Sequence, residues 1–379
     1  MKIAVLGAGR QGAVAVTDLL DEKVSHGIEE VLIADIRRDA VDGLLSRVED
    51  DRLVGGTVDA SKVDETAETL RGYDATINLV WYNLNLHVMR ACLKSGSHYT
   101  DAGGLFHMTR KQLEMDDDFR RAGLTAALGC GGSPGQMNML ARIAADKLEE
   151  VDEIHIRLGS GPAVYTLHSE TATLAQYIGK GCGTVTFKQT FGSEMKEALK
   201  TLIALGLTSK DAVEVGGGRI VPYDVVIDII EADPDQEVFG YSGRTIMDEF
   251  MIPAVEYVNG EFKEFEPLSG EEMLTFPEIL GDQLGTPNAI AKGRIKGDPA
   301  ISLAGIIRLG GTSRERTRSR YGGTGPMVSI TAQMMASGEI DRRGAYPPEA
   351  LIDPSRYKEE MKKRGSPGFL ETLIITKRT

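Results

Sequence analysis

The chain begins with a short apolar segment that runs directly into a glycine-rich turn. Residues 2–6 read KIAVL, residues 7–12 read GAGRQG, and the apolar stretch that follows predicts a helix. In this spacing Gly7 permits a tight turn, Gly9 lets the backbone approach a pyrophosphate, and Gly12 lets the helix pack against its strand. The N–H groups and the dipole at the helix N-terminus favour phosphate. The strand and helix on either side therefore make this motif a predicted dinucleotide-binding turn.

A second predicted strand, residues 31–35, ends in Asp35. A carboxylate at this place in a dinucleotide-binding fold accepts hydrogen bonds from the adenosine ribose of NAD and repels the 2′-phosphate of NADP. Arg37 and Arg38 lie two and three residues beyond Asp35 and are able to accommodate that phosphate, so NADP is the alternative cofactor. We expect NAD, because a carboxylate that faces a phosphate is a direct penalty whereas the arginines can turn to solvent.

Strands and helices alternate through six cycles up to about residue 150, which predicts an α/β fold with a doubly wound, Rossmann-type parallel sheet. The strand at 75–80 is almost continuously apolar, as expected of a parallel strand covered on both faces. Its end and the following loop with Tyr82 are expected beside the nicotinamide. Asp59, at the end of the third strand, is expected near the adenine.

Residues 151–158, VDEIHIRL, alternate strictly between apolar and polar side chains, which is typical of a half-exposed strand. We therefore expect a dinucleotide-binding domain over 1–150 and a second, α+β domain with a mixed or antiparallel sheet over 151–325. Asn259-Gly260 predicts a hairpin within it. In the last segment, 326–379, an apolar helix is expected to return to the first domain and to be followed by a surface tail.

Composition and charge exclude several classes of partner. The 43 Lys and Arg residues against 56 Asp and Glu give a net charge of −13, which disfavours nucleic-acid binding. No apolar run approaches the roughly 18 residues of a membrane span, and the early strand leaves no room for a signal peptide. We therefore expect a cytoplasmic protein without nucleic-acid or membrane partners. One face of the second predicted sheet needs to be covered. A second copy of the chain is a common way to cover it, so we expect a homodimer through residues 151–325.

The three cysteines, Cys92, Cys130 and Cys182, are few and unclustered. This pattern indicates neither a disulfide framework nor a zinc site, and we expect no metal.

Five segments carry a likeness to a known family: residues 5–12, 58–60, 98–104, 133–140 and 343–349. Through them the chain resembles the saccharopine dehydrogenase-like oxidoreductases and, within that family, the lysine 6-dehydrogenases. The resemblance implies hydride transfer between a nicotinamide cofactor and a carbon that bears an amine, in an amino acid or a diamine. With the strand ends above, it gives the expected cofactor-binding residues: Gly7, Gly9, Arg10, Gln11, Gly12, Asp35, Arg37, Asp59, Ala60, Leu79 and Val80.

Oxidation of an amine requires a group that accepts a proton from the ammonium, since the nitrogen lone pair must assist departure of the hydride. His107 follows two glycines at the end of a predicted strand, where ligands of open α/β sheets bind. His168 lies in a polar stretch, and Asp101 ends the fifth strand. An ordinary loop histidine and a surface histidine are the structural alternatives for the two histidines.

The substrate of such an enzyme is expected to contact Tyr82 and Tyr99. A substrate carboxylate is best bound by a bidentate arginine, for which Arg244 and Arg320 are the candidates. Two other functions stay open: the same cofactor can serve condensation of an amine with a carbonyl compound, as in the saccharopine- and carboxynorspermidine-forming relatives, or the chain can be a dinucleotide-binding sensor without turnover.

Overall fold

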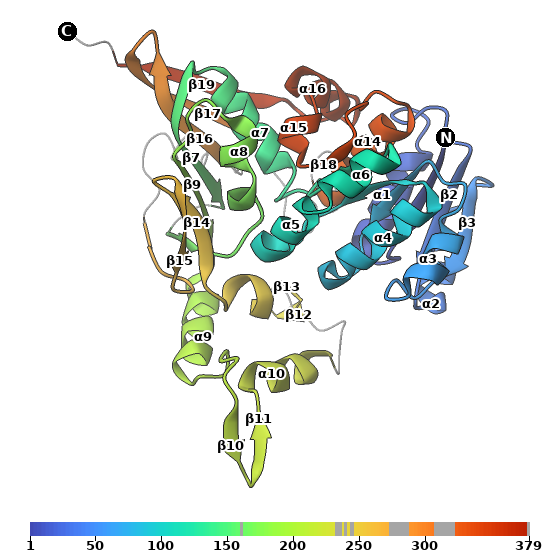
Figure 1. The fold of residues 1–379 in the computed structure, drawn as a ribbon, viewed down its shortest axis with the longest axis horizontal. Helices are drawn as coiled ribbons and strands as arrows, with labels where there is room; N and C mark the ends of the chain where they lie inside the picture. The colour runs from blue at the N-terminus through green and yellow to red at the C-terminus, as the bar shows by residue number, and fades with distance from the viewer. Residues whose placement is uncertain are drawn as a thin grey trace.

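The structure is a computed structural model that describes residues 1–159, 162–231, 237–238, 241–242, 246–272, 288–306 and 323–376. Figure 1 shows two sheets with helices between and around them, and an arm that projects away from both. The first sheet is built by residues 2–127 and by one strand near the C-terminal end. The second sheet comes from the middle of the chain and its C-terminal end.

Within the described residues, the first sheet has seven strands, all parallel, in the order β18-β6-β5-β4-β1-β2-β3. Their bounds are β1 Lys2–Leu6, β2 Glu30–Asp35, β3 Leu53–Thr57, β4 Ala75–Asn78, β5 His98–Asp101, β6 Thr125–Ala127 and β18 Gly344–Tyr346. The predicted doubly wound parallel sheet is confirmed. The strand order reverses between β1 and β4, and ligands of such sheets bind outside the carboxyl ends of the strands at this point.

Helices cover both faces of the first sheet (Figure 1). They are α1 Arg10–Leu20, α2 Arg38–Leu45, α3 Val63–Thr69, η1 Tyr82–Leu84, α4 Asn85–Ser95, α5 Leu105–Leu113, α6 Asp116–Ala122 and α14 Thr324–Ala336. Helix α7 Gln136–Asp146 packs against the second sheet instead. Ile3 and Val5 of β1 belong to one hydrophobic core, whereas Ala4 and Leu6 belong to another. All four are fully buried, which explains the continuous apolar run in the sequence.

Residues 105–122 form two consecutive helices, α5 and α6. Three consecutive aspartates, 116–118, occupy the first turn of α6. Carboxylates at that position interact favourably with the positive end of the helix dipole, so this cluster favours a new helix start.

The second sheet is mixed, as expected, and its described part has eight strands. They are β7 Glu150–Leu158, β8 Ala163–Tyr165, β9 Thr184–Thr190, β14 Ala254–Val258, β15 Glu261–Phe265, β16 Asn288–Ile295, β17 Asp298–Ile306 and β19 Phe369–Ile375. Strands β7 and β9 are parallel, and the other pairs are antiparallel. The predicted hairpin at Asn259-Gly260 joins β14 to β15, with φ of 54° and 85° at the two residues.

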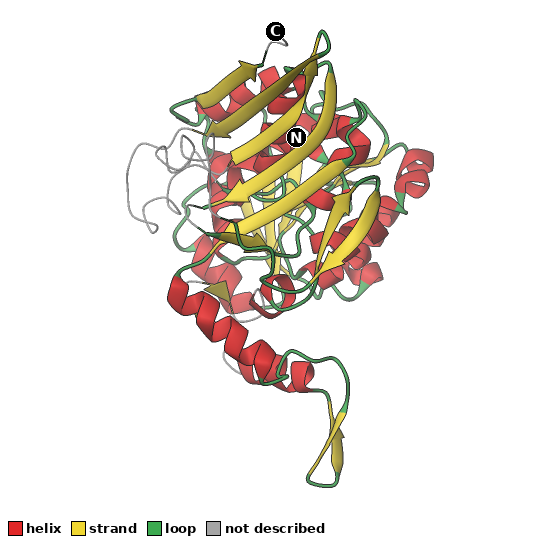
Figure 2. Cartoon of the chain, turned by 90° about the vertical axis from the view of Figure 1, so that its left-hand side faces the viewer, coloured by secondary structure: helices red, strands yellow, loops and turns green. Residues whose placement is uncertain are grey.

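Between these strands the chain adds short elements and the arm. They are η2 Glu170–Ala172, α8 Leu174–Ile178, α9 Ser193–Ala204, β10 Val213–Val215, β11 Gly218–Ile220, α10 Pro222–Glu231, β12 Glu237–Val238, β13 Tyr241–Ser242 and η3 Ile246–Phe250. Figure 2 shows the hairpin of β10 and β11 at the far end of the arm. No helix among the described residues is long and apolar enough to cross a bilayer.

The C-terminal segment differs from the expected surface tail. Its apolar helix, α14 Thr324–Ala336, is buried and packs against α1, as predicted. Beyond it, β18 extends the first sheet beside β6, and β19 extends the second sheet beside β17. Helices α15 Pro348–Leu351 and α16 Pro354–Lys363 lie between them in the chain. The many charged residues of α16 led to the expectation of a surface helix. One face of it is nevertheless buried, because Tyr357 and Met361 lie four residues apart on the same side.

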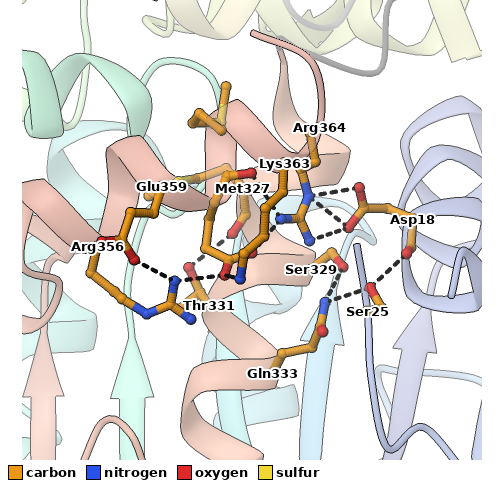
Figure 3. Close-up of polar contacts among 12 residues, drawn as sticks. Asp18, Ser25, Met327, Ser329, Thr331, Gln333, Arg356, Glu359, Lys363 and Arg364 are labelled. Atoms are coloured by element: carbon orange, nitrogen blue, oxygen red, sulfur yellow. Dashed lines mark hydrogen bonds and ion pairs between the residues drawn. The ribbon is translucent and has the colours of Figure 1, made fainter. Parts of the chain in front are cut away.

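Buried polar contacts fix this segment to the first domain (Figure 3). The Arg364 guanidinium donates to both carboxylate oxygens of Asp18 on α1, with the closest distances at 2.8 Å, and also pairs with Glu360 at 2.6 Å. The Gln333 amide of α14 bonds to Ser25 at 3.0 Å. Because a buried charge left without its partner is costly, these contacts require the tail to stay docked.

Candidate functional site

The glycine turn after β1 has the geometry that a dinucleotide needs. Gly7 has φ of +106°, and a Cβ on it would lie 2.7 Å from the carbonyl oxygen of Leu79. A Cβ on Gly12 would overlap the carbonyl oxygen of Gly7. A Cβ on Gly9, in contrast, would meet no atom within 4 Å. The fold therefore requires glycine at the first and third positions, while Gly9 borders open space that a phosphate group can enter.

The N-terminus of α1 follows this turn. Gly9 is its N-cap and supplies no side-chain cap, and no acidic residue lies in the first turn. Arg10 and Gln11 occupy that turn at the surface. Free N–H groups with a favourable dipole can hold an anion here, so the residues present fit the pyrophosphate of a dinucleotide.

The predicted adenosine-side residues surround the same edge of the sheet. One oxygen of Asp35 accepts a hydrogen bond from the Ala8 backbone N–H, and the other accepts from the Arg37 backbone N–H. The Arg37 side chain is exposed. Asp59 accepts hydrogen bonds from the hydroxyl and backbone N–H of Ser61, which lower the pKa of its carboxyl. These two carboxylates thus shape the loops that would surround the adenosine.

The remaining predicted contacts lie at the ends of β3 and β4. Ala60 is buried, and Leu79 and Val80 carry the backbone that approaches Gly7. Tyr82 is half-buried in η1, with its ring centroid 4.6 Å from that of Trp81.

Asp101 lies at the centre of a buried hydrogen-bond network at the carboxyl end of β5. Its Oδ1 accepts hydrogen bonds from the backbone N–H groups of Gly103, at 2.9 Å, and Gly129, at 2.7 Å. Its Oδ2 accepts from the Tyr99 hydroxyl at 2.7 Å and from the Gln112 amide at 2.5 Å. Burial raises the pKa of Asp101, and these donors oppose the rise. The carboxylate thereby joins the loops that follow β5 and β6.

Tyr99 is fully buried in this network, where Asn78 also donates to its hydroxyl at 3.1 Å. Burial and the neighbouring Asp101 raise its pKa well above the usual value. Its position beneath the loops supports them and leaves the tyrosine ring no exposed surface for a substrate.

His168 links the second domain to the loop after β6. Its Nδ1 pairs with Glu170, whose other carboxylate oxygen accepts a hydrogen bond from the Ser133 hydroxyl at 2.5 Å. Its Nε2 lies 3.4 Å from a carboxylate oxygen of Glu249. Burial alone would lower the pKa of His168, but the Glu170 and Glu249 carboxylates raise it to about 10. The imidazole is therefore a buried cation at neutral pH.

His107 lies elsewhere, on the exposed side of α5, with its ring centroid 5.3 Å from that of Phe106. Partial burial and nearby lysines lower its pKa, against an opposing effect of Glu264. His107 is accordingly neutral at pH 7 and able to accept a proton. No described hydrogen bond joins it to the His168 group.

Two predicted substrate contacts, Arg244 and Arg320, lie outside the described residues. Sequence reasoning missed Ser133, Glu170 and Glu249. Glu170 stands two residues from His168 in the same polar stretch, so spacing was an available signal. Ser133 opens the segment 133–140, which carries the family likeness, but nothing in the sequence linked it to His168. Glu249 is distant in sequence from His168 and carried no signal. Over the described ranges, no group of three or more histidine, cysteine or acidic side chains could hold a metal ion.

Comparison with known proteins agrees with this geometry. Residues 3–127 match the family described as saccharopine dehydrogenase NADP binding domain. Carboxyaminopropylagmatine dehydrogenase of Synechocystis sp. strain PCC 6803 is 24% identical over 305 residues, which cover 64% of this chain and 75% of the relative.

Among solved structures, the apo saccharopine dehydrogenase (L-Glu forming) of Saccharomyces cerevisiae superposes with a TM-score of 0.61 and 13% identity, and covers 98% of this chain and 99% of that one. This likeness shows a shared fold. Together the matches show that residues 3–127 are similar to the NADP binding domain of saccharopine dehydrogenase and that the chain shares the fold of that enzyme.

Proposed function

We propose that this chain, whose residues 3–127 match the saccharopine dehydrogenase NADP binding domain, is an NAD-dependent dehydrogenase of a CH–NH group in an amino acid or diamine. The observation that carries the proposal is a juxtaposition at the carboxyl edge of the first sheet. The glycine turn, with open space at Gly9, lies at this edge. The loop that contains Ser133 lies at the same edge, and the Ser133 hydroxyl bonds to Glu170, which pairs with the buried His168.

When bound, the nicotinamide dinucleotide supplies the hydride acceptor. The chain's own residues bind the cofactor, orient the substrate and remove a proton from its ammonium group. Gly9 and the first turn of α1 would hold the pyrophosphate, and Asp35 would accept the ribose hydroxyls with the lone pairs that the two backbone N–H groups leave free. We favour NAD for this reason, with Arg37 as the group that would serve a 2′-phosphate.

Proton removal falls to a neutral base, and His107 fits this requirement because its pKa is lowered. His168, in contrast, has a pKa raised to about 10 by Glu170 and Glu249, so it does not serve as the proton acceptor. The amine that loses its proton to His107 has the free lone pair that assists hydride departure. Replacing His107 with Gln should therefore lower kcat by about 10²- to 10⁴-fold and leave NAD affinity unchanged.

The decisive experiment follows reduced-nicotinamide absorbance while the protein is incubated with NAD and a panel of amino acids, diamines and alcohols. Turnover with an amine, lysine above all, supports the proposal. Activity confined to alcohols contradicts it. Tight NAD binding without turnover on any amine supports a sensor instead.

A second candidate is the reverse chemistry, reductive condensation of an amine with a carbonyl compound. It is favoured by the similarity to carboxyaminopropylagmatine dehydrogenase and saccharopine dehydrogenase, whose names place them among enzymes of substituted amines. Reduced cofactor that is consumed only when an amine and an aldehyde or 2-oxo acid are present together identifies this reaction.

We also propose a cytoplasmic homodimer built on the second domain. The outermost strands of its sheet, β15 and β19, carry the exposed apolar residues Phe262, Leu373 and Ile375. An exposed edge strand offers unpaired backbone N–H and C=O groups with which a second chain can pair. A monomeric mass in solution at micromolar concentration would remove this part of the proposal.

A further inference from the structure

We infer that Glu170 is a positioning residue, whose two carboxylate oxygens fix the Ser133 loop of the first domain and the His168 imidazole of the second in one arrangement. The inference rests on the proposed function only where turnover is measured. Its geometric part concerns the protein alone and can be tested in the absence of any substrate.

The contacts of Glu170 are divided between the two domains. Its side chain is fully buried in η2. Oε1 accepts the hydrogen bond of 2.5 Å from the Ser133 hydroxyl, and Oε2 pairs with Nδ1 of His168. A carboxylate is an acceptor, so Nδ1 must carry a hydrogen. One short side chain therefore sets both the position of the loop and the protonation of one ring nitrogen.

The imidazole has little freedom to leave this arrangement. Its ring lies 4.0 Å from that of Phe187, with the two planes within 5° of each other. A second contact between the domains adjoins it, because the Thr109 hydroxyl of α5 donates to Ser169 at 3.1 Å. Rotation of the ring would forfeit the stacking contact and both carboxylate contacts.

The charged groups around His168 come from three elements. Glu170 lies in η2, and Glu249 in η3 lies 3.4 Å from Nε2; both carboxylates favour the imidazolium. Glu256 in β14 also interacts with His168 electrostatically, but burial raises the pKa of its carboxyl well above the usual value. Of these, Glu170 makes the closest contact, so its removal should release the proton of His168 into the neutral pH range.

A nearby pair of the same type offers a matched control. Glu153 and His155 on β7 are also two residues apart in sequence and lie 2.8 Å from each other. This pair has no contact with Ser133, Glu170 or His168 among the described hydrogen bonds. Glu153→Gln therefore removes the carboxylate that pairs with His155 and leaves the contacts among Ser133, Glu170 and His168 unchanged.

The experiment compares wild type, Glu170→Gln and Glu153→Gln by NMR titration of the histidine rings and by the pH profile of kcat/KM with the amine found above. We expect His168 to remain protonated through pH 9 in wild type and its pKa to fall by about 1–3 units in Glu170→Gln. The kcat/KM of that variant should then acquire an additional ionisation between pH 6 and 9. Glu153→Gln should retain the wild-type behaviour of His168.

Two results overturn the inference: a neutral-range titration of His168 in wild type, or an unchanged His168 titration in Glu170→Gln. If Glu170→Gln does not fold, the wild-type titration still decides the protonation. Ser133→Ala then tests the loop contact and is expected to weaken NAD binding severalfold while His168 stays protonated. If no amine is turned over, the proposed function fails. The NMR titrations of His168 in wild type and in Glu170→Gln, together with NAD binding by Ser133→Ala, still test the positioning role of Glu170.

Discussion

The carboxylate of Asp35 accepts a hydrogen bond of 2.7 Å from the backbone N–H of Ala8, the residue between the first two glycines of the turn. Its other oxygen accepts a bond of 2.9 Å from the backbone N–H of Arg37. Asp35, at the end of β2, therefore fixes the glycine turn after β1. It also lies where it would accept hydrogen bonds from the ribose of a bound dinucleotide. Substitution can separate these two roles.

Replacement of Asp35 by Ser should weaken NAD binding and strengthen NADP binding. Loss of hydrogen bonds to a charged group costs roughly 1.5–3 kcal/mol, or about ten- to a hundredfold in affinity. The change also removes repulsion of a 2′-phosphate and leaves Arg37 available to it. Calorimetric titration with both cofactors measures the effect. A parallel fall of both affinities would show that Asp35 holds the turn only, and a wild-type preference for NADP would refute our cofactor assignment.

Alanine at the second and third glycines should have different effects. In Gly9→Ala the new methyl group meets no atom of the chain within 4 Å, so the free energy of unfolding should stay within about 0.5 kcal/mol while dinucleotide affinity falls. In Gly12→Ala it would overlap the Gly7 carbonyl, and such overpacking typically costs about 1–3 kcal/mol. Urea unfolding and cofactor titration separate the two. Equal loss of stability in both variants would contradict this assignment.

Asp101→Asn should destabilise the fold. The amide group would turn a donor toward donors that now bond to the carboxylate, among them the N–H groups of Gly103 and Gly129. Each buried donor left unsatisfied costs about 1–3 kcal/mol, so we expect a loss of roughly 2–6 kcal/mol in chemical unfolding. Retained stability with lost turnover would instead give Asp101 the catalytic role considered from the sequence.

Glu349 should make stability depend on pH. It is buried, one carboxylate oxygen accepts from Asn138 at 3.0 Å, and the other has no partner among the described residues. Burial raises its pKa from 4.5 to about 7. Because the folded state binds this proton more tightly, the stabilisation is complete below pH 4.5 and is lost as the pH rises through 7.

Glu349→Gln lacks this ionisation. Between pH 5 and 8 the free energy of unfolding of wild type should therefore fall by about 2.5 kcal/mol more than that of the variant. Urea unfolding at several pH values measures the difference. Parallel curves for the two proteins would show that Glu349 titrates normally.

The sequence by itself determined the features that depend on neighbouring residues. The strand at 2–6, the turn at 7–12 and the helix after it follow from local apolarity and glycine spacing, and each is present. The hairpin at Asn259-Gly260 also depends on two residues with positive φ. The buried α14 was evident from apolar residues on most of its faces. In these cases the local preference and the tertiary structure agree.

Only the tertiary structure decided which distant segments meet. The local sequences of β18 and β19 do not indicate that β18 joins the first sheet and β19 the second. The partner of each strand is determined by hydrogen bonds to backbone that is far away in the chain. The role of Asp101 was equally hidden, since its donors come from several loops. Ser133 and Glu170 are 37 residues apart. The pKa of His168 is raised because folding buries it between Glu170, which is local in sequence, and Glu249, which only the tertiary structure brings close.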